Sequence, residues 1–190
     1  MEDNIYQTPQ ADLSTGDDSD ATYYIVSTKK FLTLFISTLG IYGVYWFYKN
    51  WSLHKASTNS KIWPVMRGIF AIFFTHSLFR LVNDTLKSKS ITHEWKFEFI
   101  ATIYVISAVL SNVSDRLSAK EIGSPLTNFI GFLFLGTMAW ALYKAQIAIN
   151  MSCNDPEGLS NSNFSAANIT WIVLGAALWG LIFVGMTSFV

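Results

Sequence analysis

The chain has 190 residues, of which 51% are hydrophobic and only 14% charged. Soluble globular domains carry about 25% charged residues, so this deficit indicates a membrane protein. The 13 basic and 13 acidic residues balance to zero net charge and form no basic run of the kind that neutralises phosphates, which argues against nucleic-acid binding. The single cysteine, Cys153, excludes an intramolecular disulfide and a metal site built on paired cysteines.

The first 28 residues are polar and acidic, and they contain no lysine or arginine. They show neither a helical nor a strand period, so we predict a disordered tail over residues 1–28 and a membrane helical domain over residues 29–190. A signal peptide begins with basic residues. The acidic start therefore predicts that the first apolar segment is retained.

Five apolar runs follow the tail, at residues 31–48, 63–81, 97–113, 126–149 and 169–190. A helix rises 1.5 Å per residue, so runs of this length cross a hydrocarbon core of about 30 Å, with help from flanking residues in the shortest. Polar residues typical of loops separate the runs. We predict an all-α fold, a polytopic membrane helix bundle of about five membrane segments.

The first run admits two interpretations because Gly40 interrupts it and aromatic residues crowd its second half. One is a straight or kinked span that ends in a belt of aromatic side chains at the headgroup level. The other is a helix that breaks at Gly40 and continues along the interface or re-enters. We favour the span. The aromatic interface motif consists of Tyr42, Tyr45, Trp46, Tyr48 and Trp51.

The distribution of basic residues does not settle the orientation. Lysine and arginine divide seven against six between the two sides if all five runs cross the membrane, and eight against five if the first run re-enters. The positive-inside rule needs a clearer asymmetry. The small gain is the best support that the sequence gives to the broken helix.

The second run carries the densest polar face of any membrane segment. His76, Arg80 and Asp84 follow one another at intervals of four residues, with Asn83 beside them, so they share one helical stripe. We favour a structural role, in which His76 bonds to another helix and Arg80 reaches the interface and pairs with Asp84. The alternative is a functional polar site within the membrane.

Four further polar residues lie near the ends of the predicted segments. We expect Arg67 to extend its side chain to the nearer interface. Gln146, Asn150 and Asn168 are expected to cap backbone groups or to bond between helices. A ligand site at this rim is the alternative.

Residues 40–51, GIYGVYWFYKNW, resemble a motif of uncharacterised small bacterial inner-membrane proteins, some of them classed as domains of unknown function. The leader at residues 4–11 and the Trp63-Pro64 step are similar to that group as well, although Ile5 stands where the group usually has proline. The resemblance implies a location in the bacterial cytoplasmic membrane and names no substrate, cofactor or partner. It draws attention to Arg67, His76, Arg80, Gln146 and Asn150.

The sequence contains no phosphate-binding glycine loop with lysine, no His-Glu-x-x-His and no Gly-x-Ser-x-Gly, so we expect neither an enzyme nor a cofactor. The favoured hypothesis is a non-enzymatic accessory or organising membrane protein. Its partners would be the lipid bilayer and other membrane proteins or a second copy, without nucleic acid. The alternative is a small oligomeric transporter or channel-like protein that uses the polar face of the second run. A membrane enzyme acting on lipid ranks last.

Overall fold

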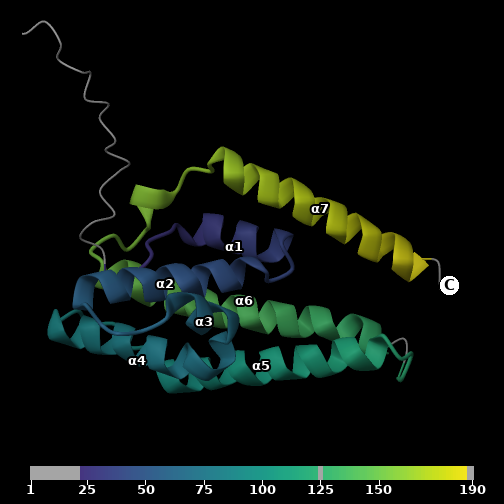
Figure 1. Ribbon diagram of the computed structural model, residues 1–190, viewed down its shortest axis with the longest axis horizontal. Coiled ribbons are helices and arrows are strands. Elements are labelled where there is room, and N and C mark those ends of the chain that lie inside the picture. The colour runs from purple at the N-terminus through teal and green to yellow at the C-terminus, as the bar shows by residue number, and fades with distance from the viewer. Residues whose placement is uncertain (1–21, 124–125, 188–190) are drawn as a thin grey trace, which may run out of the picture.

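The computed structural model describes residues 22–123 and 126–187, and these form an all-α structure. Figure 1 shows the longer helices running side by side along the longest axis. This confirms the all-α part of the predicted fold class for the described residues. The elements are α1 (Thr28–Ser37), α2 (Tyr42–Thr58), α3 (Pro64–Ile69), α4 (Ala71–Ser88), α5 (Phe97–Ser118), α6 (Leu126–Ser152), the short 3-10 helix η1 (Leu159–Asn161) and α7 (Ala166–Thr187).

Three helices in the described part of the chain are long and apolar enough to cross a membrane. They comprise all of α5, residues 129–152 of α6 and residues 166–185 of α7. They correspond to the predicted runs 97–113, 126–149 and 169–190, of which residues 188–190 lie outside the described part. Helices α5 and α6 pack against each other as an antiparallel pair, and the Thr137 hydroxyl donates to Ser107 Oγ across their interface at 2.8 Å.

The first apolar run forms a helical hairpin. Helix α1 ends at Ser37, and Leu39 and Gly40 take left-handed φ angles of 53° and 85°, which Gly40 adopts without steric cost. The ring of Phe31 then lies 6.0 Å from that of Tyr42 and 6.0 Å from that of Trp46, so α2 runs back along α1. The favoured single span over residues 31–48 is therefore wrong, and the broken helix is correct.

The second apolar run is also broken, at Phe70. Helix α3 has only six residues, and its Gly68 lies so close to α2 that an added Cβ would be 3.0 Å from the Val44 carbonyl oxygen. The chain then turns into α4, which continues to Ser88. The single helix predicted over residues 63–81 is thus wrong, because a close approach to α2 replaces a continuous span.

The tip of the first hairpin lies opposite the middle of α6 and α7. An added Cβ on Gly40 would be 3.3 Å from Leu135 of α6. On the other side, the Trp179 indole of α7 donates to the Ile36 carbonyl at 3.0 Å. Both hairpins therefore start and finish at the same end of the molecule, where α4 leads into α5 and α6 into α7 (Figure 1). We call this the hairpin end.

The segment that precedes α1 is part of the core. Tyr23, Tyr24 and Val26 are all buried, so the disordered tail predicted over residues 1–28 cannot extend to residue 28. Residues 1–21 lie outside the described part of the chain.

Gly175 provides a test of how α7 docks on the first hairpin. An added Cβ at this position would overlap the carbonyl oxygen of Ser37, and backbone cannot move aside as a flexible side chain can. We expect Gly175→Ala to lower the free energy of unfolding in detergent by about 1–3 kcal/mol. The matched control is Gly180→Ala on the same helix, because an added Cβ there meets nothing within 4 Å. Equal stability of the two variants would contradict this docking.

Candidate functional site: a buried amide cluster at the hairpin end

The most elaborate polar site in the described structure surrounds the extended segment Tyr24–Ser27. Two residues of α6, Gln146 and Asn150, lie one turn apart and face it. The Gln146 amide donates to the Tyr24 carbonyl at 3.1 Å and to Asn150 Oδ1 at 2.7 Å. Asn150 donates to the Val26 carbonyl at 3.0 Å and accepts from the Val26 N–H at 3.4 Å. The side chain of Asn150 thus pairs both backbone groups of Val26.

Helix α2 holds the same segment from a second direction. Asn50 accepts the Tyr24 N–H at 3.1 Å and donates to the Trp46 carbonyl at 2.9 Å. The Trp46 indole donates to the side-chain oxygen of Gln146. All three polar side chains of this bridge are fully buried. The segment therefore connects α2 to α6 through amide groups.

A third group of bonds comes from η1 and α1. Asn161 donates to the Ile25 carbonyl at 2.9 Å and accepts from the Lys30 ammonium, which also donates to the Asn163 carbonyl at 2.6 Å. Lys30 is only 4% exposed, and burial lowers its pKa. Gly158 completes the enclosure with a φ of 65°, where a Cβ would lie 2.6 Å from the backbone of Ser27.

We call Asn50, Gln146, Asn150 and Asn161 the amide cluster. Each of its four residues bonds to backbone of the 24–27 segment, where an unpaired buried backbone group would cost about 1–3 kcal/mol. Amides donate and accept at once but do not titrate near neutral pH. The chemistry of the cluster is therefore that of a clamp on a peptide segment.

The sequence identified part of this cluster. We predict from the sequence that Gln146 and Asn150 cap backbone groups or bond between helices. In the structure they bond to the backbone of an extended segment. Asn50 and Asn161 were missed. The four-residue spacing of Asn50 from Trp46, and of Asn150 from Gln146, was the available signal.

Asn168 lies apart from the cluster and caps α7. It accepts the Ser165 N–H at 3.1 Å, while its own N–H donates to Ser165 Oγ at 3.3 Å. This reciprocal pair resembles a capping box at a helix N-terminus. Its role at this position is to satisfy the helix start.

The polar stripe of the second run divides between different surroundings. His76 Nε2 lies 3.1 Å from the Thr102 hydroxyl of α5, so it makes the expected contact between helices. Asn83 is buried, whereas Arg80 and Asp84 are both exposed. The four residues do not converge on one point.

Most of the aromatic motif fills the core. Trp46 and Trp51 are fully buried and Tyr42 nearly so, whereas Tyr45 and Tyr48 are exposed. A belt of five residues at the headgroup level is therefore wrong for the two tryptophans. Both tryptophans lie on the face of α2 that packs on the rest of the structure.

Arg67 is half-buried and packs on aromatic rings of the structure. Its guanidinium group lies 4.2 Å from the centroid of the Trp51 ring and 4.9 Å from that of Phe74, a geometry of favourable cation–π contacts. The expected extension to the interface is thus replaced by stacking. Burial, with the nearby Arg67 charge, lowers the pKa of His54, which stacks on Tyr23.

Positive charge accumulates at the hairpin end. No acidic residue occurs between Asp20 and Asp84, an interval that contains the first hairpin, α3 and most of α4. All 13 lysines and arginines except Arg116 and Lys120 belong to the hairpins, the loops at this end or the final turns of α6. The fold therefore distributes lysine and arginine unequally between the two ends of the molecule, whereas the five-span interpretation divided them almost equally.

No protein family, curated protein or solved structure matches this chain.

The clamp can be tested by replacing Asn150 with an apolar side chain of similar size. Asn150→Leu leaves the N–H and C=O of Val26 without partners, and each unpaired buried group costs about 1–3 kcal/mol. We expect a loss of stability in detergent and faster protease cleavage between residues 21 and 28. Asn112→Leu is the control, because Asn112 is exposed and its amide bonds only to Ala108 in its own helix. Unchanged cleavage in Asn150→Leu would show that the cluster does not hold the segment.

Proposed function

We propose that the chain is a multi-pass protein of the bacterial cytoplasmic membrane, with α5, α6 and α7 as spans and the two hairpins as re-entrant segments. Length supports this assignment. Helix α1 has 10 residues and α3 has six, which correspond to about 15 Å and about 9 Å of helix. Neither crosses a hydrocarbon core of about 30 Å, and each turns back into a partner helix.

The charge asymmetry supports a cytoplasmic hairpin end. Cytoplasmic loops carry an excess of lysine and arginine, and only Arg116 and Lys120 lie beyond the hairpin end and the segments that return to it. The loop between α5 and α6 then faces the periplasm. The hairpins enter the bilayer from the cytoplasm.

Cysteine labelling tests this topology. In a Cys153→Ser background, we place single cysteines by Lys29→Cys and Ser57→Cys before and after the first hairpin, and by Lys120→Cys in the loop after α5. A membrane-impermeant maleimide should label only Lys120→Cys in intact cells and all three after permeabilisation. Labelling of Ser57→Cys but not Lys29→Cys in intact cells would restore a full crossing between them.

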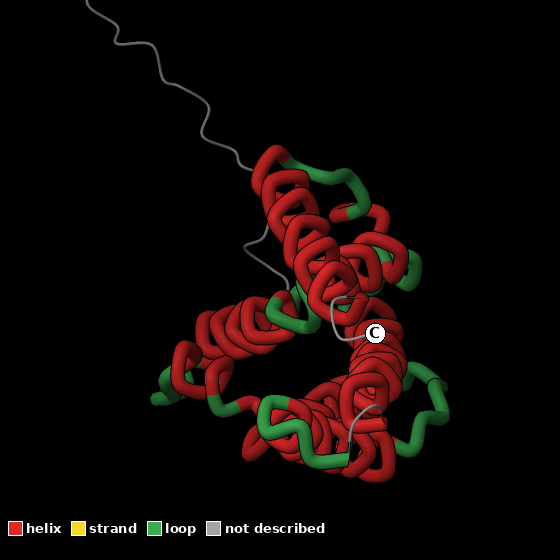
Figure 2. Tube along the Cα trace, turned by 90° about the vertical axis from the view of Figure 1, so that its right-hand side faces the viewer, coloured by secondary structure: helices red, strands yellow, loops and turns green. Residues whose placement is uncertain are grey.

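The proposed role is that of a non-enzymatic accessory or organising protein that associates laterally through α7. The observation that carries this proposal is the exposure of α7. Only 6% of its most apolar stretch is buried inside the structure, against 33% of the corresponding stretch of α5 and 44% of that of α6. Figure 2 shows α7 along one side of the helix group, away from the α4 and α5 region.

The contacts that join α7 to the first hairpin and to α6 include Gly175 and Trp179. Gly175 and Trp179 meet the first hairpin, and the Trp179 ring stacks on Phe132 of α6 at 5.4 Å. Beyond them, Leu181 and Phe183 are each 70% exposed. Lipid tails are as apolar as these side chains, so helix association in membranes depends on close packing. Gly180, with open space above it, allows such an approach.

Site-directed cross-linking in native membranes tests the lateral contact. With Cys153→Ser as background, Leu181→Cys should give a cross-linked product of defined mass with a short bifunctional thiol reagent or an amine-thiol reagent. Val113→Cys is the control, because Val113 is 47% exposed at a similar depth on α5 and should give none. The mass of the product separates a second copy from another membrane protein. Absence of a product at Leu181→Cys, Phe183→Cys and Gly180→Cys would contradict association through α7.

A further inference from the structure

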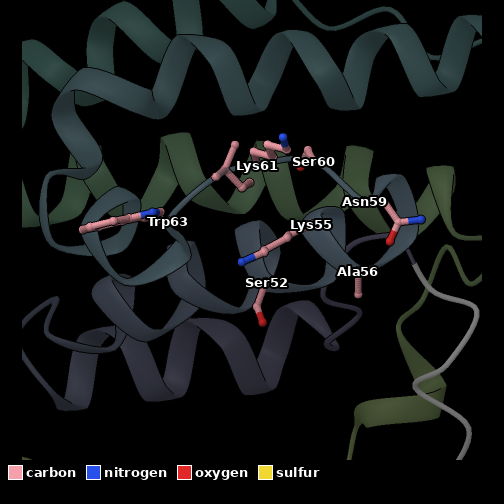
Figure 3. A pocket seen from close by; sticks show the side chains of 8 residues that line it. Ser52, Lys55, Ala56, Asn59, Ser60, Lys61 and Trp63 are labelled. Carbon is pink, nitrogen blue, oxygen red and sulfur yellow. The ribbon is translucent and has the colours of Figure 1, made fainter.

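A basic pocket lies between the C-terminal half of α2 and the linker that leads to α3. It has a volume of about 620 Å³ and is lined by Ser52, Lys55, Ala56, Asn59, Ser60, Lys61, Ile62 and Trp63. Figure 3 shows the lining residues, which come from the C-terminal half of α2 and from the linker beside it. None of the lining residues is acidic. The pocket thus presents two ammonium groups, two hydroxyls and an amide.

The Trp63 side of the pocket borders an apolar surface. Trp63 is 76% exposed, and exposed apolar side chains follow it at Val65, Met66 and Ile69 of α3 and at Phe70. The linker before it is polar. Tryptophan favours the headgroup level of a bilayer, so a boundary between exposed apolar and polar residues at Trp63 places the pocket at that level.

The charged groups of the pocket are accessible to a ligand, because Lys55 and Lys61 are exposed. The hydroxyl oxygen of Ser60 is buried and without a hydrogen-bond partner. No acidic side chain lines the pocket. Two ammonium groups in a pocket without carboxylates are complementary to a phosphate anion, which offers several acceptor oxygens.

We propose that this pocket binds the phosphate headgroup of an anionic phospholipid of the cytoplasmic leaflet. Lys55 and Lys61 pair with the phosphate, and Trp63 packs beside the upper part of an acyl chain. A lipid is favoured over a free phosphate because the pocket adjoins the apolar surface of α3. This inference requires the hairpin end to lie at the membrane surface, but it does not depend on the accessory role of α7.

Native mass spectrometry of the full chain can measure the retained lipid. The protein is purified in a mild detergent and equilibrated with equal amounts of phosphatidylglycerol and phosphatidylcholine. We expect wild type to retain phosphatidylglycerol preferentially. A lysine near an anionic membrane surface contributes roughly a fivefold factor in binding, so Lys55→Gln/Lys61→Gln should lower phosphatidylglycerol affinity by at least about tenfold.

Two further variants separate a specific pocket from general surface charge. Lys87→Gln/Lys96→Gln removes the same charge from exposed positions at the same end and should leave the preference unchanged. Lys55→Arg/Lys61→Arg keeps both charges and should restore most of the binding. An equal loss in the two glutamine variants, or no preference for phosphatidylglycerol in wild type, would overturn the proposal.

Inorganic phosphate serves as the competing probe. If the pocket binds a lipid, millimolar phosphate should leave the retained phosphatidylglycerol nearly unchanged, because a free anion lacks the contacts with α3. Complete displacement by phosphate, together with phosphate binding in lipid-free detergent, would identify a soluble-anion site and overturn the assignment to lipid. Neither outcome alters the cysteine-labelling or cross-linking results.

Discussion

The structure depends on the clamping of an extended peptide segment by buried amides. Residues 24–27 are neither helix nor strand, so their backbone groups have no regular partners. In a buried position such groups must be paired by side chains. Asn50, Gln146 and Asn150 supply the pairs, and in doing so they fix α2 relative to α6. The first hairpin is therefore held in a defined position against α6 although α1 has only 10 residues.

The hairpins also explain the distribution of charge and aromatic residues. Once the chain reverses at Leu39 and Gly40, the basic residues before and after the turn lie at one end of the molecule. The same reversal places Trp46 and Trp51 against the core. One local feature, a left-handed turn in an apolar run, thus determines where the basic residues lie and which aromatic residues of the motif are buried.

The sequence predicted the three helices that could cross a membrane because each is a long uninterrupted apolar run. It offered the break in run 31–48 only as the alternative and did not predict the break in run 63–81, since both runs have the length of spans and their breaks depend on contacts. Gly40 was visible as an interruption, but Phe70 is an ordinary apolar residue, and its break follows from the packing of Gly68 on Val44. The amide cluster was predicted only in part. The groups that it pairs belong to the backbone of residues 24–27, which the composition assigned to a disordered tail. Pairings between residues more than 120 positions apart leave no local pattern.

The same separation has a consequence for biosynthesis. Val26 is paired by a residue 124 positions later in the chain, so its backbone groups have no partner in Asn150 until the C-terminal part of α6 has been synthesised. During that interval water or another protein must satisfy these polar groups. The contacts of the hairpin end therefore form late in synthesis. A nascent chain that stops before residue 150 already contains α1 to α5 but lacks the clamp, so the C-terminal part of α6 completes the support of the first hairpin.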